Sequence, residues 1–255
     1  MKEYLLELLK NGKREDNRKL DEYREISFKV GLIKKAEGSA LLNIGNTSIL
    51  AGVKLDVGEP FPDSPNEGIL IVNAEFSPIA SPHFEPGPPS EDAIELARVV
   101  DRGLRESKLI DFEKLCIKEN EKVWIIYVDI HVLNDDGNLI DASFLASLLA
   151  LKNASLVKYD EKIIREEKIG KLPLRNYTPI NISVFKVGDI LFLDPTSKEL
   201  DLVECCLSVC IRDDGKINSI QKIGSGYFSF EEIKKVFTIA MKKAEEIRKL
   251  LSNIS

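Results

Sequence analysis

Hydrophobic residues in the first third of the chain are spaced in a way that predicts one short helix followed by several strands. Residues 2–10 carry apolar side chains at helical spacing, and Asn11 and Gly12 follow as a helix end. Period-two alternation, interrupted by turns at Gly38 and Gly45, then indicates a series of strands. The predicted strands cover residues 26–33, 39–44, 47–55 and 68–74.

A proline-rich segment, residues 76–90, separates these strands from a longer helix. Its prolines predict a stiff, exposed loop. Ser90 can cap the helix that follows, and the acidic Glu91 and Asp92 suit its positive end. The apolar residues of this helix share one face, and they are Ala93, Leu96, Ala97, Val100 and Leu104.

The second half of the chain predicts a buried strand, a helix, a connector and further strands. Residues 122–133 are nearly all apolar apart from Asp129 and His131, which is typical of a central strand buried on both faces. Residues 140–157 are rich in small residues and predict a helix that packs closely against a sheet. The remaining predictions are a charged connector at 161–176, strands at 180–187, 189–193, 202–212 and 216–223, and a closing helix at 230–251.

This order of elements predicts an α+β protein built from two similar βαβα-type halves, with mixed sheets and packed helices. A short internal repeat supports the two halves, because the residues 27–31 (SFKVG) resemble the residues 184–188 (VFKVG). We place the first domain at residues 1–160, the second at residues 178–255, and the connector between them at residues 161–177.

Composition limits the classes of function. The 255 residues are 44% hydrophobic, which suffices for a large core, and the net charge of −6 argues against indiscriminate nucleic-acid binding. Apolar runs stay shorter than the about 20 residues of a membrane helix. The N-terminal segment is amphipathic and carries acidic residues, so it does not resemble a secretory signal. We expect a cytoplasmic protein without membrane contact, whose four cysteines are buried, reduced thiols.

Three arginines are the strongest candidates for binding. Arg98, Arg102 and Arg105 fall in one narrow stripe of the predicted helix, opposite its apolar face. A row of guanidinium groups on a rigid element fits a phosphodiester backbone. The alternative is a solvated face held by ion pairs, since Glu95 and Asp101 lie at suitable spacings.

Other candidate chemistry is weaker. His131 is expected to be a core residue, and His83 in the proline-rich loop has no evident partner. The turn at residues 224–226 is a weak candidate for phosphate binding. Acidic residues also cluster late in the chain, but their spacings fit a polar turn better than a metal triad, and they are Asp194, Glu199, Asp201 and Glu204. We expect neither a metal site nor a cofactor.

Several motifs together resemble RNase PH-type phosphorolytic nucleases. The opening segment, residues 12–18 (GKREDNR) with residues 21–24 (DEYR), is similar to the first motif of that family. The resemblance covers nearly the whole chain in the right order. It continues through residues 38–51, 95–107 (ELARVVDRGLRES), 135–143 (DDGNLIDAS), 193–199 (LDPTSKE) and 220–226 (IQKIGSG). It implies the RNase PH fold.

The departures from the family pattern concern its catalytic positions. Catalytic members carry a Gly-Gly-Ser/Thr-Arg phosphate loop, where this chain has Leu139 and Ile140, which cannot donate hydrogen bonds to phosphate. Two family aspartates are replaced by Leu200 and Cys206, and leucine can neither hold a divalent ion nor give a proton. Asp201 is one residue away, where we expect a strand to turn it to the other face.

This combination resembles the non-catalytic RNase PH-like subunit of the archaeal exosome. The resemblance implies a catalytic paralogue as partner, three such pairs in a six-membered ring, and RNA-binding cap subunits on one side. Single-stranded RNA enters the ring and is shortened from its 3′ end by phosphate. The resemblance further implies RNA contacts for Arg98, Arg102 and Arg105. Arg14 and Arg18 would serve a structural role, an interface or RNA.

Two rival hypotheses stay open at this point. The chain could be an active phosphate-dependent 3′–5′ exoribonuclease in its own right, for which Asp194, Asp201 and Glu204 would have to serve. It could also be a small-molecule enzyme that kept the fold and lost RNA, because a fold alone does not decide function.

Overall fold

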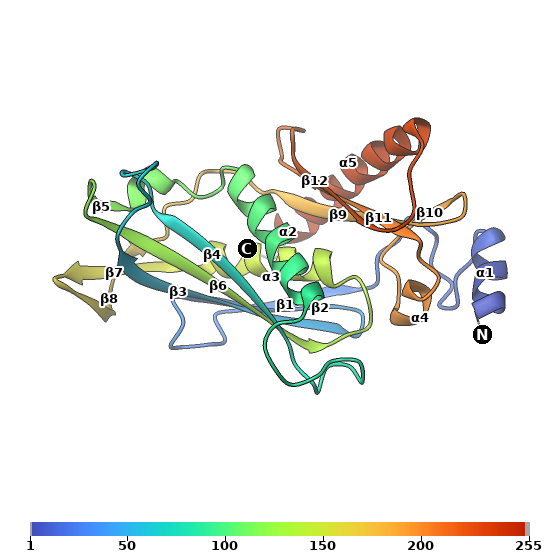
Figure 1. Ribbon diagram of the computed structural model, residues 1–255, viewed down its shortest axis with the longest axis horizontal. Coiled ribbons are helices and arrows are strands. Elements are labelled where there is room, and N and C mark those ends of the chain that lie inside the picture. The colour runs from blue at the N-terminus through green and yellow to red at the C-terminus, as the bar shows by residue number, and fades with distance from the viewer. Residues whose placement is uncertain (1, 253–255) are drawn as a thin grey trace.

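A computed structural model describes residues 2–252, which form two β-sheets with helices between and beside them (Figure 1). The first sheet has the strand order β1-β2-β3-β6-β4, and β5 also pairs with β6. Its strands are β1 (Ile26–Val30), β2 (Gly38–Ile44), β3 (Thr47–Gly58), β4 (Ile69–Phe76), β5 (Cys116–Lys118) and β6 (Lys122–Asn134). The β4–β6 pair is parallel, because helix α2 (Glu91–Glu106) crosses between these strands.

The second sheet is antiparallel, with the order β10-β9-β11-β12. Its strands are β9 (Ile180–Val187), β10 (Ile190–Leu193), β11 (Cys205–Ile211) and β12 (Ile217–Gly224). A separate hairpin joins β7 (Ser155–Asp160) to β8 (Lys162–Lys171). The predicted α+β class with mixed sheets is therefore confirmed.

Helices α2 and α3 (Leu139–Asn153) lie between the two sheets, and α5 (Phe230–Ser252) covers the far face of the second sheet (Figure 1). A Cβ built at Gly103 of α2 would lie 2.5 Å from the ring of Phe144 in α3, so the two helices pack closely. Shorter helices are α1 (Lys2–Lys10), α4 (Ser197–Leu200) and the 3-10 turn η1 (Phe112–Leu115). Within residues 2–252, no helix combines the length and apolar character that crossing a bilayer requires.

The core of the first sheet follows from alternation along β3, whose residues are alternately buried and half-buried from Thr47 to Leu55. Helix α3 covers the buried face. A Cβ at Gly38 of β2 would lie 2.3 Å from the carbonyl oxygen of Ala150, so only glycine permits this approach of helix and strand. The close packing that the small residues of α3 predicted is thus present.

The two faces of the second sheet differ in polarity. The face toward α5 carries Ile182, Val184 and Val209, which are buried in the main core. The face toward α3 carries Asn181 and Ser183, which surround a carboxylate of that helix. The second sheet therefore joins the first half of the molecule through buried hydrogen bonds as well as apolar packing.

Four predictions about elements and burial need correction. Helix α3 ends at Asn153 rather than 157, and residues 162–171 of the predicted connector form β8. Strand β6 has one buried and one half-buried face rather than two buried ones. Cys116 is half-buried, whereas the other three cysteines are buried, and all four are free thiols.

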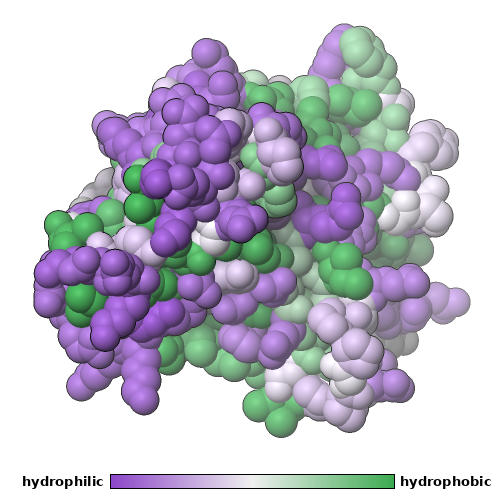
Figure 2. All heavy atoms as spheres, turned by 60° about the vertical axis from the view of Figure 1, so that its left-hand side comes forward, coloured by the Kyte–Doolittle hydropathy of each residue, from purple (hydrophilic) through white to green (hydrophobic). Residues whose placement is uncertain are grey.

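The hairpin escaped prediction because it is exposed. Strand β8 has no buried residue, so its charged sequence lacks the hydrophobic alternation of a half-buried strand. Figure 2 turns the hairpin end of the molecule toward the viewer and shows hydrophilic side chains over much of it, with smaller hydrophobic areas between them.

Candidate nucleic-acid interface

The N-cap of helix α2 sets where the helix begins, and its buried apolar face sets which side carries the arginines. The Ser90 side chain accepts a hydrogen bond from the backbone N–H of Ala93 at 3.3 Å, as predicted. Leu96, Val100 and Leu104 are buried against the first sheet. Arg98 and Arg102 are consequently exposed on the opposite side.

Arg98 and Arg102 line one cleft of about 380 Å³ between α2 and strands β11 and β12. Ser208, Ser219 and Gln221 of these strands form the other wall. Within residues 2–252, neither guanidinium has a hydrogen-bond or ion-pair partner, so the pair that the Glu95–Arg98 spacing allowed is not formed. Two exposed guanidinium groups that form no ion pair make this cleft the strongest candidate anion site among the predicted residues.

Arg105 is separated from the other two arginines of the predicted stripe. Its guanidinium donates to the Asp101 carboxylate at 2.8 Å and to the Leu70 carbonyl at 2.9 Å. It lies over the ring of Phe112 and lines a different cleft. The structure thus brings Arg98 and Arg102 together and leaves Arg105 in the ion pair that the sequence alternative proposed.

Arg14 of the opening motif is buried inside the molecule. Its side chain is 0% exposed and forms a two-point ion pair with Glu199 at the start of α4. It also donates to the carbonyl oxygens of Leu193 and Asp194, both at 2.8 Å. All three guanidinium nitrogens donate within the chain, so among the roles expected for Arg14 the geometry supports the structural one.

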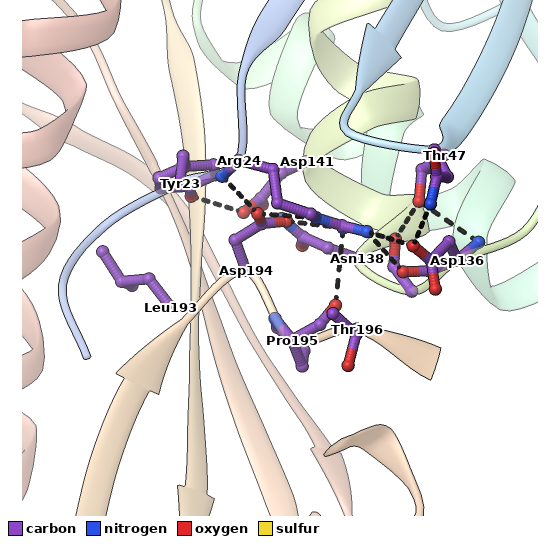
Figure 3. A network of polar contacts seen from close by, with 12 residues as sticks. Tyr23, Arg24, Thr47, Asp136, Asn138, Asp141, Leu193, Asp194, Pro195 and Thr196 are labelled. Atoms are coloured by element: carbon purple, nitrogen blue, oxygen red, sulfur yellow. Dashed lines mark hydrogen bonds and ion pairs between the residues drawn. The ribbon is translucent and has the colours of Figure 1, made fainter. Parts of the chain in front are cut away.

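Arg18 and Arg24 converge on the buried carboxylate of Asp194. Figure 3 shows Arg24 beside this carboxylate. Arg18 donates to it at 2.9 Å, and Arg24 donates through its backbone N–H and two guanidinium nitrogens at 2.7–2.9 Å. Asn138 adds a further hydrogen bond of 3.0 Å. These donors hold Asp194 in the left-handed region, with φ +46°, which a non-glycine residue adopts only at a cost.

Arg24 links this carboxylate to the loop before α3 that contains Asp136. It donates to the Asp136 carbonyl at 2.6 Å and forms an ion pair with its carboxylate at 3.1 Å (Figure 3). Burial lowers the pKa of Arg24, but the hydrogen bonds and charge of Asp194 and Asp136 outweigh it and raise that pKa. The sequence motif contained Arg24, but nothing local to it indicated a partner in the second half of the chain.

The loop around Gly137, before α3, packs against the loop at residues 194–196, before α4. A Cβ at Gly137 would lie 2.4 Å from the carbonyl oxygen of Pro195, so glycine is required where the two loops meet. Leu139 and Ile140 are half-buried against the main core at the start of α3. Leu200 packs in a second hydrophobic cluster with Cys206, whose thiol pKa is raised well above its usual range by burial. These four side chains therefore contribute to packing.

Asp141 of α3 is a second buried carboxylate, and sequence reasoning did not single it out. It accepts hydrogen bonds from the Tyr23 hydroxyl at 2.6 Å, the Asn181 amide at 2.8 Å and the Ser183 hydroxyl at 2.7 Å. Burial raises its pKa although these donors favour the ionised form. Asp141 ties the opening segment, α3 and β9 together.

The remaining acidic candidates each bind a different partner within the chain. Asp194 is buried among arginines, Asp201 is exposed and pairs with Lys2, and Glu204 accepts from the backbone N–H of Gly188. Asp201 follows α4 in a turn rather than in a strand, so the strand argument about its direction does not apply. No group of three metal-ligating side chains occurs in the described part of the chain.

Both histidines lie in one cleft beside the proline-rich loop. His131 is not the core residue that was expected. Its side chain is 43% exposed on the half-buried face of β6, and its Nδ1 lies 3.2 Å from a Glu75 oxygen on the neighbouring strand.

The sequence and the structure of this chain are similar to those of known proteins of one family. Residues 22–156 match the model of the 3′ exoribonuclease family, domain 1, and residues 177–243 match domain 2 of that family. The exosome complex component Rrp42 of Pyrococcus furiosus is 46% identical over 99% of this chain and 93% of the relative. The protein of the same name from Methanocella arvoryzae is 45% identical over 99% and 96%.

Solved structures agree with the sequence relatives. A chain of the Archaeoglobus fulgidus exosome with RNA bound to the active site superposes with a TM-score of 0.91 and 41% identity, covering 98% of this chain and 96% of that one. A chain of an archaeal exosome core gives a TM-score of 0.88 and 38% identity over 98% and 95%. Rice Rrp46, 17% identical with a TM-score of 0.71, shares the fold. The chain belongs to the 3′ exoribonuclease (RNase PH) family.

Proposed function

We propose that this member of the RNase PH family is a non-catalytic, RNA-binding subunit of an archaeal exosome core. The proposal is supported by relatives named exosome complex component Rrp42, which match over nearly their full length. It is also supported by the similarity to a chain of an exosome with RNA in its active site. The chain's role is to grip RNA and to complete the active site of a catalytic partner.

The main observation in support of RNA binding is that two guanidinium groups on α2 form no ion pair within residues 2–252. Arg98 and Arg102 face the same cleft and, within residues 2–252, form no ion pair, although the chain has a net charge of −6. A surface with local cations in an acidic protein binds a phosphate backbone at one place rather than everywhere. Binding of this kind tolerates any RNA sequence, because phosphates carry no base information. Arg105 makes a smaller contribution because Asp101 already neutralises it.

The proposal that the chain has no catalytic activity of its own is supported by the side chains at the family's catalytic positions. Leu139 and Ile140 offer no hydrogen-bond donor to an attacking phosphate, and Leu200 offers no ligand for a divalent ion. The carboxylate that a self-sufficient enzyme would need, Asp194, is neutralised by Arg18 and Arg24. Phosphorolysis therefore requires phosphate-binding and acidic groups from another subunit.

The partner is a catalytic RNase PH-like subunit. Three such heterodimers form a six-membered ring, and RNA-binding cap subunits sit on one side of it. Single-stranded RNA passes into the ring, where Arg98 and Arg102 hold its backbone while the partner transfers the 3′-terminal nucleotide to phosphate.

A reconstitution experiment tests this function. The purified chain, the purified partner and the assembled complex are each incubated with single-stranded RNA, inorganic phosphate and Mg²⁺, and released nucleoside diphosphates are quantified. The chain alone should release none, and the complex should release more than the partner alone. Release of nucleoside diphosphates by the chain alone would show that it is an active nuclease.

A further inference from the structure

The cleft beside Arg98 and Arg102 has a second wall of uncharged polar side chains. Gln221 and Ser219 of β12 lie opposite Ser208 and Cys210 of β11 in the antiparallel register. Because alternate residues of a strand share a face, all four point to the side on which α2 packs. Ser208, Ser219 and Gln221 line the cleft.

Two of these side chains have unused hydrogen-bonding capacity. The Ser208 hydroxyl is committed, since it accepts from Asn181 at 2.8 Å and donates to it at 3.1 Å. The Gln221 amide nitrogen donates only to the carbonyl of Lys222, at 3.3 Å. Among residues 2–252, the Gln221 amide oxygen and the Ser219 hydroxyl have no partner. The second wall can therefore both donate to and accept from a ligand.

The cleft is also polarised along α2. Glu91 and Glu95 line it toward the start of the helix, whereas Arg98 and Arg102 line it one to two turns further on. An anionic group is thus attracted to the arginine end and repelled from the other. The volume, about 380 Å³, falls in the range of small-molecule sites. These properties suit a ligand with one anionic end and a neutral, hydroxyl-bearing body.

We propose that Ser219 and Gln221 bind the ribose of the nucleotide whose phosphate is held by Arg98 and Arg102. The 2′-hydroxyl both donates and accepts hydrogen bonds, and it is the group that distinguishes RNA from DNA. The arginines supply affinity for any phosphodiester chain, and β12 supplies the preference for RNA. This inference rests on the proposed RNA-binding function and adds a specificity site to it.

The test measures RNA and DNA binding side by side. The chain is assembled with its catalytic partner in phosphate-free buffer, so that no phosphorolysis occurs. Dissociation constants are measured for a ten-nucleotide oligouridine and for its 2′-deoxy counterpart. Combining Ser219→Ala with Gln221→Met should weaken RNA binding about threefold to tenfold, the effect of one or two hydrogen bonds, and leave DNA binding unchanged.

Matched variants separate this inference from the proposed function. Ile220→Ala changes the opposite face of β12 and should leave both dissociation constants unchanged. Combining Arg98→Ala with Arg102→Ala should weaken RNA and DNA alike. Thermal unfolding confirms that each variant is folded. If the variant with both Ser219→Ala and Gln221→Met does not fold, the single variant Gln221→Met is used in its place.

The outcomes are distinct. An unchanged RNA-to-DNA ratio in the β12 variant, with both oligonucleotides weakened by the arginine variant, would overturn the ribose site and leave the proposed function standing. No effect of the arginine variant on either oligonucleotide would overturn the RNA-binding function itself.

Discussion

Two groups of arginines in this molecule have the same chemistry and opposite environments. Arg14 of the opening segment is buried, and Arg18 and Arg24 are half-buried. All three bind carboxylates or carbonyl oxygens of the second half of the chain. Arg98 and Arg102 are exposed on α2, and within residues 2–252 they have no partner. The first group connects the two halves of the protein, and the second group is available to a ligand.

The difference shows that the supply of acceptors, rather than the arginine itself, decides the role. A guanidinium stays charged at any physiological pH, so burial without a paired anion is prohibitively costly. Asp194 and Glu199 meet that need for the opening segment. On α2, Arg98 and Arg102 form no ion pair within residues 2–252, and their charge is tolerated because the side chains are solvated.

Removing the shared carboxylate of the buried group should have the largest effect. Asp194→Ala removes the buried carboxylate that Arg18 and Arg24 share and leaves them only their ion pairs with Asp16 and Asp136. We expect a loss of about 3–5 kcal/mol in the free energy of unfolding. Chemical denaturation measures this loss. Asp201→Ala, which removes an exposed carboxylate, is the control and should change the free energy by less than about 0.5 kcal/mol. Equal effects of the two variants would refute the difference in roles.

An intermediate case is Glu37, a buried carboxylate that pairs with the partly exposed Lys54 and Arg165. Burial tends to raise its pKa, but hydrogen bonds from Lys54, Arg165 and the backbone of Leu55 lower it overall. We expect Glu37→Gln to cost about 1–2 kcal/mol at pH 7.

The pH dependence of Glu37 has a definite sign. A carboxylate whose pKa is lower in the folded state stabilises the protein above its unfolded pKa, and this contribution is lost as the pH falls through the folded pKa. The stability gap between the wild type and Glu37→Gln should therefore narrow from pH 7 toward pH 3. A gap that stays constant or widens in acid would contradict the assignment.

The smallest effects on stability separate the members of the arginine stripe. Arg105→Ala removes an ion pair with Asp101 and a hydrogen bond to the Leu70 carbonyl, and it should cost about 1 kcal/mol. Arg98→Ala and Arg102→Ala remove no hydrogen bond or ion pair within the described chain and should each change the free energy of unfolding by less than about 0.5 kcal/mol. Thermal or chemical unfolding of the three variants in parallel distinguishes them, and three equal values would argue against two environments.

Short-range features of the fold were predictable from the sequence. Ser90 accepts a hydrogen bond from an N–H only three residues away, and the apolar positions of α2 recur at helical spacing within one helix. The charged hairpin strand β8 and the early end of α3 were not predictable from local patterns. The backbone N–H of Ser155, at the start of β7, donates to the Glu37 carbonyl, a contact that no pattern near residue 155 indicates.

The candidate site was only partly predictable for the same reason. Helical spacing placed Arg98 and Arg102 on one face, but the strands opposite them come from more than a hundred residues later. The burial of Arg14 depends on Glu199, which lies 185 residues away. Spacing alone could not separate Arg105 from its neighbours either, because the Leu70 carbonyl that binds it belongs to another element.

The salt dependence of RNA binding tests the central claim most directly. Dissociation constants of the assembled complex for single-stranded RNA are measured between low and moderate salt, with and without Arg98→Ala combined with Arg102→Ala. Each phosphate contact to a single strand contributes about 0.7 to the log–log slope, so the variant should bind more weakly and its slope should be shallower by about 1.4. An unchanged slope would show that the two arginines form a solvated face without a role in binding RNA.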